Sequence, residues 1–368
     1  MEFDSNIKYK KLYYILRSLI LSGILQKGDQ VPSENRLKKK YACSRETIRK
    51  SLTLLKEEGL IESARGSGTY VAYDLSKINE GKRHVGLILS YLSDYLFPSL
   101  FSGIKEVLDE ADYKIDVGVT KNDLNVEHFY LNRFLHSGVS GLIVEGSMSA
   151  FPNPNINFYH ELEARGIPIL FIHNHYCNLK FSSIEMADAG AAYQLTETLI
   201  KNGHKKIAGI FKSDDLQGIE RYRGFIECMA DYHIPVQNDL IQWYTTEGKN
   251  DLLTPRYASH FRKKMGDTSG LFFYNDEIAY PFLKHLGSAG ADLKKLSTVS
   301  FDDLKMIMNF PEKLLSAVHP KEQLGEKAAH TILAMMGDAH WADSDYSYRY
   351  PVLINDGSSV HNYYLEGR

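Results

Sequence analysis

The chain has little cysteine and tryptophan and no long hydrophobic run, although it contains 368 residues. Its three cysteines, Cys43, Cys177 and Cys228, lie far apart and form no CxxC pair. This spacing excludes a disulfide framework and a zinc knuckle, and it is typical of single thiols in a reducing cytoplasm. No window approaches the roughly 18 uninterrupted apolar residues of a membrane span. We therefore expect a cytoplasmic protein with no membrane partner.

The N-terminus, MEFDSNIKYKK, has acidic residues early and lacks an apolar segment before a small-residue cleavage site. It is therefore not a signal peptide, which argues against a secreted binding protein. An overall excess of one charge is also absent, since the formal net charge is −3. Residues 1–75 nevertheless hold 14 basic and 9 acidic residues, which leaves 29 basic and 37 acidic residues in 76–368. A basic head on an acidic body favours nucleic acid as the partner of the head alone.

The first sixty residues predict three helices. Apolar residues in 6–23 recur at three- and four-residue spacing, as in an amphipathic helix. Ser33 is placed to cap a short helix that runs to about Tyr41, and Ser44 is placed to cap a helix that runs to about Glu58. Two short helices on either side of a tight break are typical of a helix-turn-helix.

Two short strands are expected next, at 60–63 and 69–72, around Arg65-Gly66-Ser67-Gly68. The glycines permit the positive φ of a tight hairpin, and their lack of a Cβ lets the backbone approach DNA closely. Residues 1–72 therefore predict a winged helix-turn-helix domain that binds double-stranded DNA.

A recognition helix presents its first turn to base edges in the major groove. Arginine bonds guanine bidentately, serine and threonine reach phosphate or base, and glutamate accepts from cytosine. We expect the lysines to contact phosphates, although Lys38-Lys39-Lys40 can also be read as a solvated helix face. The candidate DNA-binding residues are Lys8, Tyr9, Ser33, Ser44, Arg45, Glu46, Thr47, Arg49, Arg65, Gly66, Ser67 and Gly68.

The head also resembles a known family. The run QVPSENRLKKKYACSRETIRKSLTLLKEEGLIESARGSGTYV resembles the winged-helix domain of GntR-type bacterial regulators. This resemblance implies that Arg45, Thr47 and Arg49 contact an operator and that Gly66–Gly68 enters the minor groove. The matching pieces are Pro32-Ser33-Glu34, Ser44-Arg45-x-Thr47-Ile48-Arg49, Gly59-Leu60-Ile61 and Gly66-x-Gly68-Thr69-x-Val71.

Residues 73–83 are polar and without period, and we interpret them as a linker. From there, residues 84–368 alternate short apolar runs with amphipathic stretches, which predicts an α/β fold with parallel strands. The runs are numerous enough for two sheets. The expected strands are 85–89, 115–119, 141–144, 167–172, 206–211, 241–245, 271–274, 298–301 and 316–318.

Polar residues lie at or just beyond the carboxyl ends of many of these strands, where open α/β sheets bind their ligands. Carboxylates, amides and aromatic rings are the groups that bind a sugar. One pocket can therefore collect Tyr91, Glu145, His173, Asn275, Asp276, Asp302 and His319.

Several of these residues have a plainer interpretation. Glu145 can be solvated, Asp302 can cap the following segment, and His319 can be a hinge residue beside a proline. His173 and His175 could suggest a metal pair, but alternate residues of a strand face opposite sides and no third ligand is near. We therefore expect no metal or other cofactor.

Residues 84–365 resemble the sugar-binding core of LacI/GalR regulators, which is similar in turn to periplasmic sugar-binding proteins. The resemblance implies two lobes with a sugar between them. It implies that Arg221, Asn275 and Asp302 contact sugar hydroxyls and that Tyr91 and Phe97 form an aromatic wall. A surface ion pair is the alternative for Arg221. The markers are HVGLIL, GIKEVLDEADYKI, SGLIVEG, GHKKIAGIF, ERYRGF, FFYNDEIA, STVSFDD and SAVHPKEQLGEKAA.

A GntR-type head on a LacI-type core resembles the arabinose-responsive repressors of Gram-positive bacteria. This implies a homodimer that binds a near-palindromic operator. It also implies that the operator is released when a monosaccharide, with L-arabinose as the first candidate, binds to the effector domain formed by residues 84–368. One alternative is a regulator with the same domain organisation that responds to another sugar or to a sugar phosphate. The other is a sugar-processing enzyme with a DNA-binding appendage. We expect no enzyme, because the sequence contains no P-loop, GxGxxG, GxSxG or HExxH motif.

Overall fold

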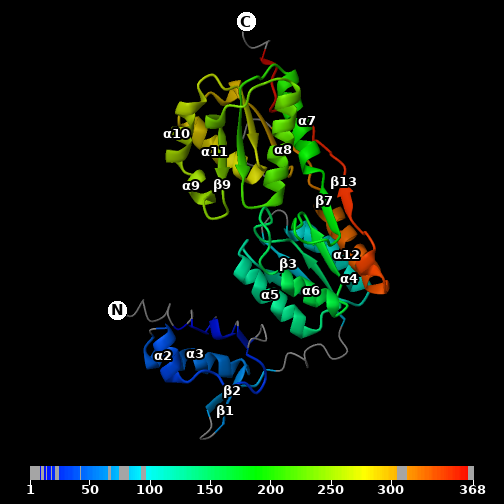
Figure 1. The fold of residues 1–368 in the computed structure, drawn as a ribbon. Helices are drawn as coiled ribbons and strands as arrows, with labels where there is room; N and C mark the ends of the chain where they lie inside the picture. Colours follow the sequence, from blue (N-terminus) through cyan, green and yellow to red (C-terminus); the bar gives the residue numbers. More distant parts are fainter. Residues whose placement is uncertain are drawn as a thin grey trace.

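The computed structural model describes residues 9, 12–13, 15–17, 19–20, 25–41, 43–64, 68–73, 83–92, 97–304 and 313–363. These residues form an N-terminal head and a body of two α/β lobes, which follow one another in Figure 1. The head has a two-stranded sheet, the first lobe a six-stranded sheet and the second lobe a five-stranded sheet. The predicted α/β class with a winged helix-turn-helix at its N-terminus is confirmed.

The head consists of two capped helices and a hairpin, together with the residues described between Tyr9 and Ile20, which are helical. Its elements are α2 (Glu34–Tyr41), α3 (Arg45–Glu57), β1 (Ile61–Ala64) and β2 (Gly68–Val71). Thr47 N donates to Ser44 Oγ over 3.1 Å, which confirms Ser44 as the cap of α3. Apolar side chains of the helices and of both strands meet in one buried core.

The first lobe is a parallel sheet covered by helices on both faces. Its strand order is β13-β7-β6-β5-β3-β4. Helices α4 and α12 share one buried cluster with the sheet, and α5 and α6 share another. The elements of this lobe are β3 (His84–Leu89), α4 (Phe97–Glu110), β4 (Lys114–Val119), α5 (Leu124–Ser137), β5 (Gly141–Val144), α6 (Ile156–Ala164), β6 (Ile169–Ile172), β7 (Ser183–Met186), α12 (Lys321–Gly337), η4 (Trp341–Asp343) and β13 (Tyr348–Tyr350).

The second lobe repeats this plan with the parallel strand order β12-β11-β10-β8-β9. Helices α7 and α8 cover one face, and α10 and α11 cover the other. The elements of this lobe are α7 (Asp188–Lys201), β8 (Ile207–Lys212), α8 (Leu216–Asp231), η2 (Asn238–Leu240), β9 (Ile241–Tyr244), α9 (Lys249–Leu252), α10 (Pro255–Met265), β10 (Gly270–Phe273), α11 (Asp276–Ser288), η3 (Leu293–Lys295), β11 (Ser297–Phe301) and β12 (Leu315–Ala317).

The chain passes between the lobes three times, after β7, after β12 and after β13. These passages lie side by side: Ala187 N donates to Tyr350 O over 3.1 Å, and Val318 N donates to Leu353 O over 2.7 Å. The nine strands predicted in residues 84–368 are all present, with ends that shift by at most two residues. The prediction missed β7 and β13, which pair with each other at one end of the first sheet.

Candidate DNA-binding surface and effector cleft

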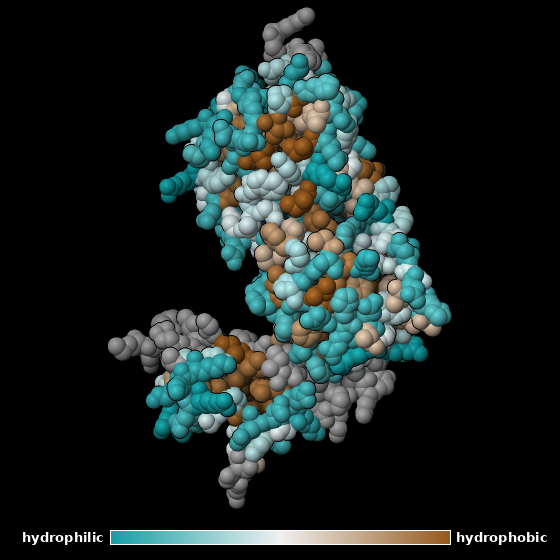
Figure 2. Space-filling model, in the orientation of Figure 1, coloured by the Kyte–Doolittle hydropathy of each residue, from teal (hydrophilic) through white to brown (hydrophobic). Residues whose placement is uncertain are grey.

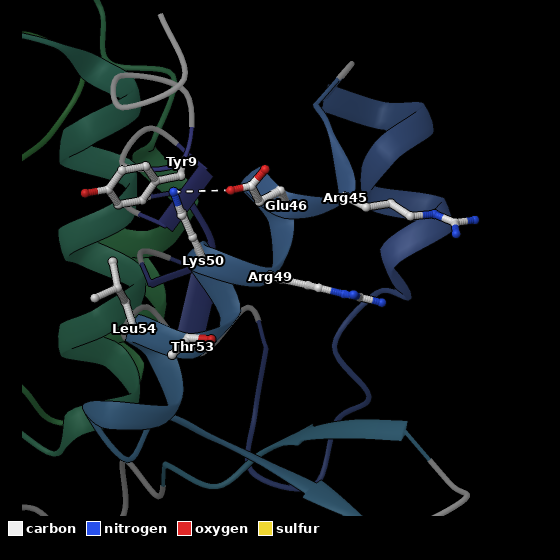
Figure 3. A pocket seen from close by; sticks show the side chains of 7 residues that line it. All are labelled: Tyr9, Arg45, Glu46, Arg49, Lys50, Thr53 and Leu54. Carbon is white, nitrogen blue, oxygen red and sulfur yellow. Dashed lines mark ion pairs between the residues drawn. The ribbon is translucent and has the colours of Figure 1, made fainter. Parts of the chain in front are cut away.

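The exposed face of α3 forms a shallow groove with a volume of about 610 Å³. Figure 3 shows Arg45 and Arg49 extending to the same side of this helix, while Lys50 turns back toward Glu46. Figure 2 shows a hydrophilic surface over α2, next to a hydrophobic patch in the middle of the head. The groove is lined by Tyr9, Arg45, Glu46, Arg49, Lys50, Thr53 and Leu54.

Both arginines of the groove are held by α2. Arg49 Nε lies 2.9 Å from Glu34 Oε1, and Arg45 Nη2 donates to Asn35 Oδ1 over 3.5 Å. Because both remain exposed, these contacts orient the guanidinium groups without withdrawing them from a DNA groove.

The other predicted DNA-binding residues of the head do not line this groove in the same way as the two arginines. Thr47 is 6% exposed, and its hydroxyl oxygen lies 2.9 Å from the Oγ of the cap residue Ser44, so these two hydroxyls bond each other in the structure. Ser33 Oγ accepts from Arg36 N at the start of α2. Gly68 has a φ of +125°, and a Cβ there would lie 2.6 Å from Gln30 Nε2, so glycine is required at this end of the hairpin. The predicted contacts outside the described residues are Lys8, Arg65, Gly66 and Ser67.

A cleft with a volume of about 670 Å³ lies between the two lobes. This volume is within the roughly 300–1,000 Å³ that is usual for small-molecule sites. Residues that follow β3, β4, β5 and β6 form one wall, and residues from the ends of β8, β9, β10 and β11 form the other. The structure brings together in this cleft the predicted residues Tyr91, Phe97, Glu145, His173, Arg221, Asn275, Asp302 and His319.

Arg221 is the most constrained of these residues, with only 1% of its surface exposed. Its Nε donates to Asp188 Oδ1 and its Nη1 donates to Tyr274 O, each over 2.7 Å. The guanidinium carbon also lies 4.6 Å from the centre of the Tyr274 ring and 4.0 Å from that of Phe301. Burial alone would lower the pKa of Arg221, but the Asp188 carboxylate raises this pKa above its ordinary value. The alternative of a surface ion pair is therefore wrong.

Glu145 and His173 form a second buried pair at the ends of β5 and β6. Glu145 Oε2 accepts from Ser90 N over 2.7 Å, and Glu145 Oε1 lies 3.2 Å from His173 Nδ1. Burial is the largest single influence and favours the neutral acid, but His173, the Ser90 N–H and the Lys212 charge together outweigh it and lower the pKa of Glu145. The carboxylate is thus ionised and fixed in place, which is not the solvated state considered as an alternative.

Asp276 is the one predicted cleft residue that the structure does not place there, and this corrects the sequence-based assignment. Its carboxylate points into the second lobe, where Oδ2 accepts from Leu304 N over 2.8 Å and Oδ1 accepts from Ser316 Oγ over 3.2 Å. Burial raises the pKa of Asp276 to about 7. The neighbouring Asn275 lines the cleft, and its side chain caps α11 by accepting from Ile278 N.

The sequence analysis missed a charged cluster at the end of β8. Lys212 Nζ donates to Asp215 Oδ2 over 2.9 Å and lies 3.5 Å from Asp214 Oδ1. The same ammonium group lies 5.8 Å from the centre of the Tyr91 ring, in the other lobe. Burial alone would lower the pKa of Lys212, but the two carboxylates raise it above its ordinary value. A signal was available, because Lys212 is a polar residue at a strand end.

Among the described residues, no group of three or more His, Cys, Asp and Glu side chains is arranged to hold a metal ion. Within the same part of the chain, no helix has the length and apolar character needed to cross a membrane.

Comparison with known proteins identifies both parts of the chain. Residues 8–71 match the gntR family of bacterial regulatory proteins. Residues 82–351 match the family of periplasmic binding proteins and the sugar binding domain of the LacI family. The arabinose metabolism transcriptional repressor of Geobacillus stearothermophilus is 33% identical over 89% of this chain and 91% of its own length. The protein of the same name from Halalkalibacterium halodurans is 35% identical over 89% of this chain and 88% of its own length.

A solved structure supports the fold of the body. The LacI family transcriptional regulator from Enterococcus faecium, which was crystallised with bound ribose, has a TM-score of 0.61 at 20% identity. The match covers 76% of this chain and 99% of that one. These relatives are transcription regulators and not enzymes, which confirms the expectation from the missing catalytic motifs. The chain therefore belongs to the transcriptional repressors that join a GntR-type DNA-binding domain to a LacI-type sugar-binding domain.

Proposed function

We propose that this repressor binds a near-palindromic operator as a homodimer and releases it when L-arabinose enters the cleft between its lobes. The names of the two relatives support the choice of sugar, and the bound ribose in the Enterococcus faecium regulator supports a pentose-sized ligand. The observation that carries the proposal is the cleft itself, because it combines an aromatic wall with fixed carboxylate, amide and guanidinium groups.

The charges of the cleft favour a neutral sugar over a sugar phosphate. Three of the cations that line it are already paired with carboxylates, so they offer little to a phosphate group. A neutral sugar instead takes paired hydrogen bonds from such fixed groups and leaves the ion pairs intact. The pairs are Arg221 with Asp188, Lys212 with Asp215 and Lys249 with Glu277.

Release requires that binding in the cleft changes the geometry of the heads. The lobes already touch around the cleft: Asn122 Nδ2 donates to Thr246 Oγ1 over 2.8 Å, and Leu216 N donates to Ser149 Oγ over 3.0 Å. A sugar that contacts both walls adds to these contacts and holds one arrangement of the lobes. In a dimer, that arrangement sets the spacing of the two heads relative to the two half-sites. A coupling free energy of about 1–3 kcal/mol weakens operator binding roughly 5- to 150-fold.

The test is calorimetric titration of the purified chain with a panel of free sugars and sugar phosphates, followed by operator binding with and without the best ligand. We expect L-arabinose to bind with micromolar affinity and to weaken operator binding. If another sugar binds instead, the repressor assignment stands and the choice of L-arabinose is wrong. If no compound of the panel binds, the proposed effector class is wrong.

A further inference from the structure

Two imidazole nitrogens in the cleft have no hydrogen-bond partner among the described residues. They are His173 Nε2 and His319 Nδ1. Both residues are 6% exposed, and their rings meet edge to face with centroids 5.0 Å apart. Buried nitrogens without a partner are rare in folded proteins, so each calls for an explanation, and a ligand in the cleft would supply one.

The neighbours of His173 determine which of its nitrogens carries the hydrogen. The ionised Glu145 carboxylate can only accept, so His173 Nδ1, 3.2 Å away, carries a hydrogen and Nε2 is left for a ligand. Glu145 is itself fixed by the donation from Ser90 N. His173 also has a φ of +65°, a left-handed conformation that is costly for a residue with a Cβ and that is concentrated at functional sites. The ring is therefore held in one orientation.

The surroundings of His319 keep its imidazole neutral. It lies on the chain passage between β12 and α12, beside the cations Arg221 and Lys321, and Lys321 Nζ donates to Asp302 O over 2.7 Å. Burial first, and then His173, Lys321 and Arg221, lower the pKa of His319 well below its ordinary value. A neutral imidazole has one donor and one acceptor nitrogen, so His319 can supply either role at Nδ1.

We propose that His173 Nε2 and His319 Nδ1 bind two adjacent hydroxyl groups of one sugar molecule and thereby select a ligand with a free vicinal diol. His173 Nε2 bonds the first hydroxyl, and His319 Nδ1 bonds the second. The inference rests on the proposed function, because it assumes that a neutral sugar occupies the cleft. It adds the atoms that recognise the sugar and the pattern of hydroxyls that they require.

The experiment uses substitutions that each keep one nitrogen position, because Asn carries its amide near Nδ1 and Gln carries its amide near Nε2. His173→Asn and His319→Gln remove the two ligand-binding positions, whereas His173→Gln and His319→Asn keep them. The matched control is His175→Asn, whose ring lies 2.6 Å from Glu185 and does not line the cleft. L-arabinose affinity is measured by calorimetry, and operator affinity without sugar and thermal unfolding report on folding.

We expect His173→Asn and His319→Gln each to weaken L-arabinose binding by about tenfold or more, while the other variants stay within about threefold of the unsubstituted chain. All five are expected to bind the operator normally. Singly deoxygenated arabinoses identify the hydroxyl that each imidazole binds. An analogue that lacks this hydroxyl binds the unsubstituted chain more weakly than L-arabinose does. In the variant without the matching imidazole, the analogue and L-arabinose should bind equally well.

Two outcomes overturn the proposal in distinguishable ways. If L-arabinose binds the unsubstituted chain, and His173→Asn and His319→Gln bind it equally well, the histidine pair is wrong and the proposed function stands. If the unsubstituted chain binds no neutral sugar, its own titration shows that the proposed function fails and the histidine pair fails with it. A sugar other than L-arabinose that binds is carried through the same variants.

Discussion

At the scale of single residues, the two candidate sites depend on arginines that the fold holds in different ways. Arg45 and Arg49 are exposed and are oriented by polar side chains of α2. Arg221 is buried and is bonded to a carboxylate that lies 33 positions away in the sequence. The exposed arginines are therefore free to exchange their partners for DNA, whereas Arg221 serves the fold and the cleft together.

Arg45→Ala is expected to weaken operator binding by about 1–3 kcal/mol and to relax the preference at one base pair. The physical reason is the loss of a bidentate guanidinium from the first turn of α3. Band-shift titrations with single-base operator variants measure both effects. Lys56→Ala, in the last turn of the same helix, is the matched control and should change affinity much less. Unchanged operator affinity in Arg45→Ala would remove this residue from the readout.

Arg221→Met is expected to lower the free energy of unfolding by about 3–5 kcal/mol, because it leaves the Asp188 carboxylate buried without its cation. Adding Asp188→Asn removes that charge and should recover much of the loss. Denaturant titrations of the single and double variants measure this recovery. The response to sugar should stay absent in both, since neither has the guanidinium in the cleft. A normal response in the double variant would show that Arg221 is only structural.

At the scale of elements, the sequence predicted what local patterns control. Serine caps marked the starts of α2 and α3, and apolar runs marked the strands covered on both faces. The prediction missed β7 and β13 because they are short and carry polar residues, and because β13 is an edge strand that pairs only with β7. Strand pairing between residues 164 positions apart leaves no local signal.

The same limit explains which cleft residues could be predicted from the sequence and which could not. The rule that ligands bind beyond strand ends found Tyr91, Glu145 and His173, because each lies at the end of an obvious apolar run. It wrongly included Asp276, since a strand end does not show which way the next side chain points. It could not find Asp188, which reaches the cleft wall only through Arg221.

Helices α4 and α12 pack through glycines on both sides, and this contact is testable. Figure 1 shows α12 against α4 on the outer side of the first lobe. A Cβ at Gly325 would collide with the Leu100 carbonyl oxygen, and one at Gly103 would collide with that of Glu322. Gly325→Ala should therefore cost about 1–3 kcal/mol of unfolding free energy. Gly337→Ala, in the last turn of α12, meets no atom within 4 Å and should be neutral or slightly stabilising. Equal thermal midpoints for the two variants would contradict the packing.

At the scale of the whole molecule, the charge division separates the two binding events. The net basic head faces a polyanion, whereas the cleft pairs its own charges internally. Raising the salt concentration from about 50 to 200 mM should weaken operator binding by about a thousandfold if roughly six phosphates are neutralised. Over the same range, L-arabinose affinity should change by less than about twofold, because buried pairs are little screened. Parallel titrations of the full chain with operator and sugar measure both; equal salt dependence would contradict the separation.

The three passages between the lobes have a consequence for the order in which the ribosome makes this protein. The head emerges first, but the first lobe lacks α12 and β13 until residue 350 has been made, after nearly all of the second lobe. The apolar cluster that α12 covers stays open until then. Translation that stops before α12 thus leaves the first lobe without the helix that closes this cluster.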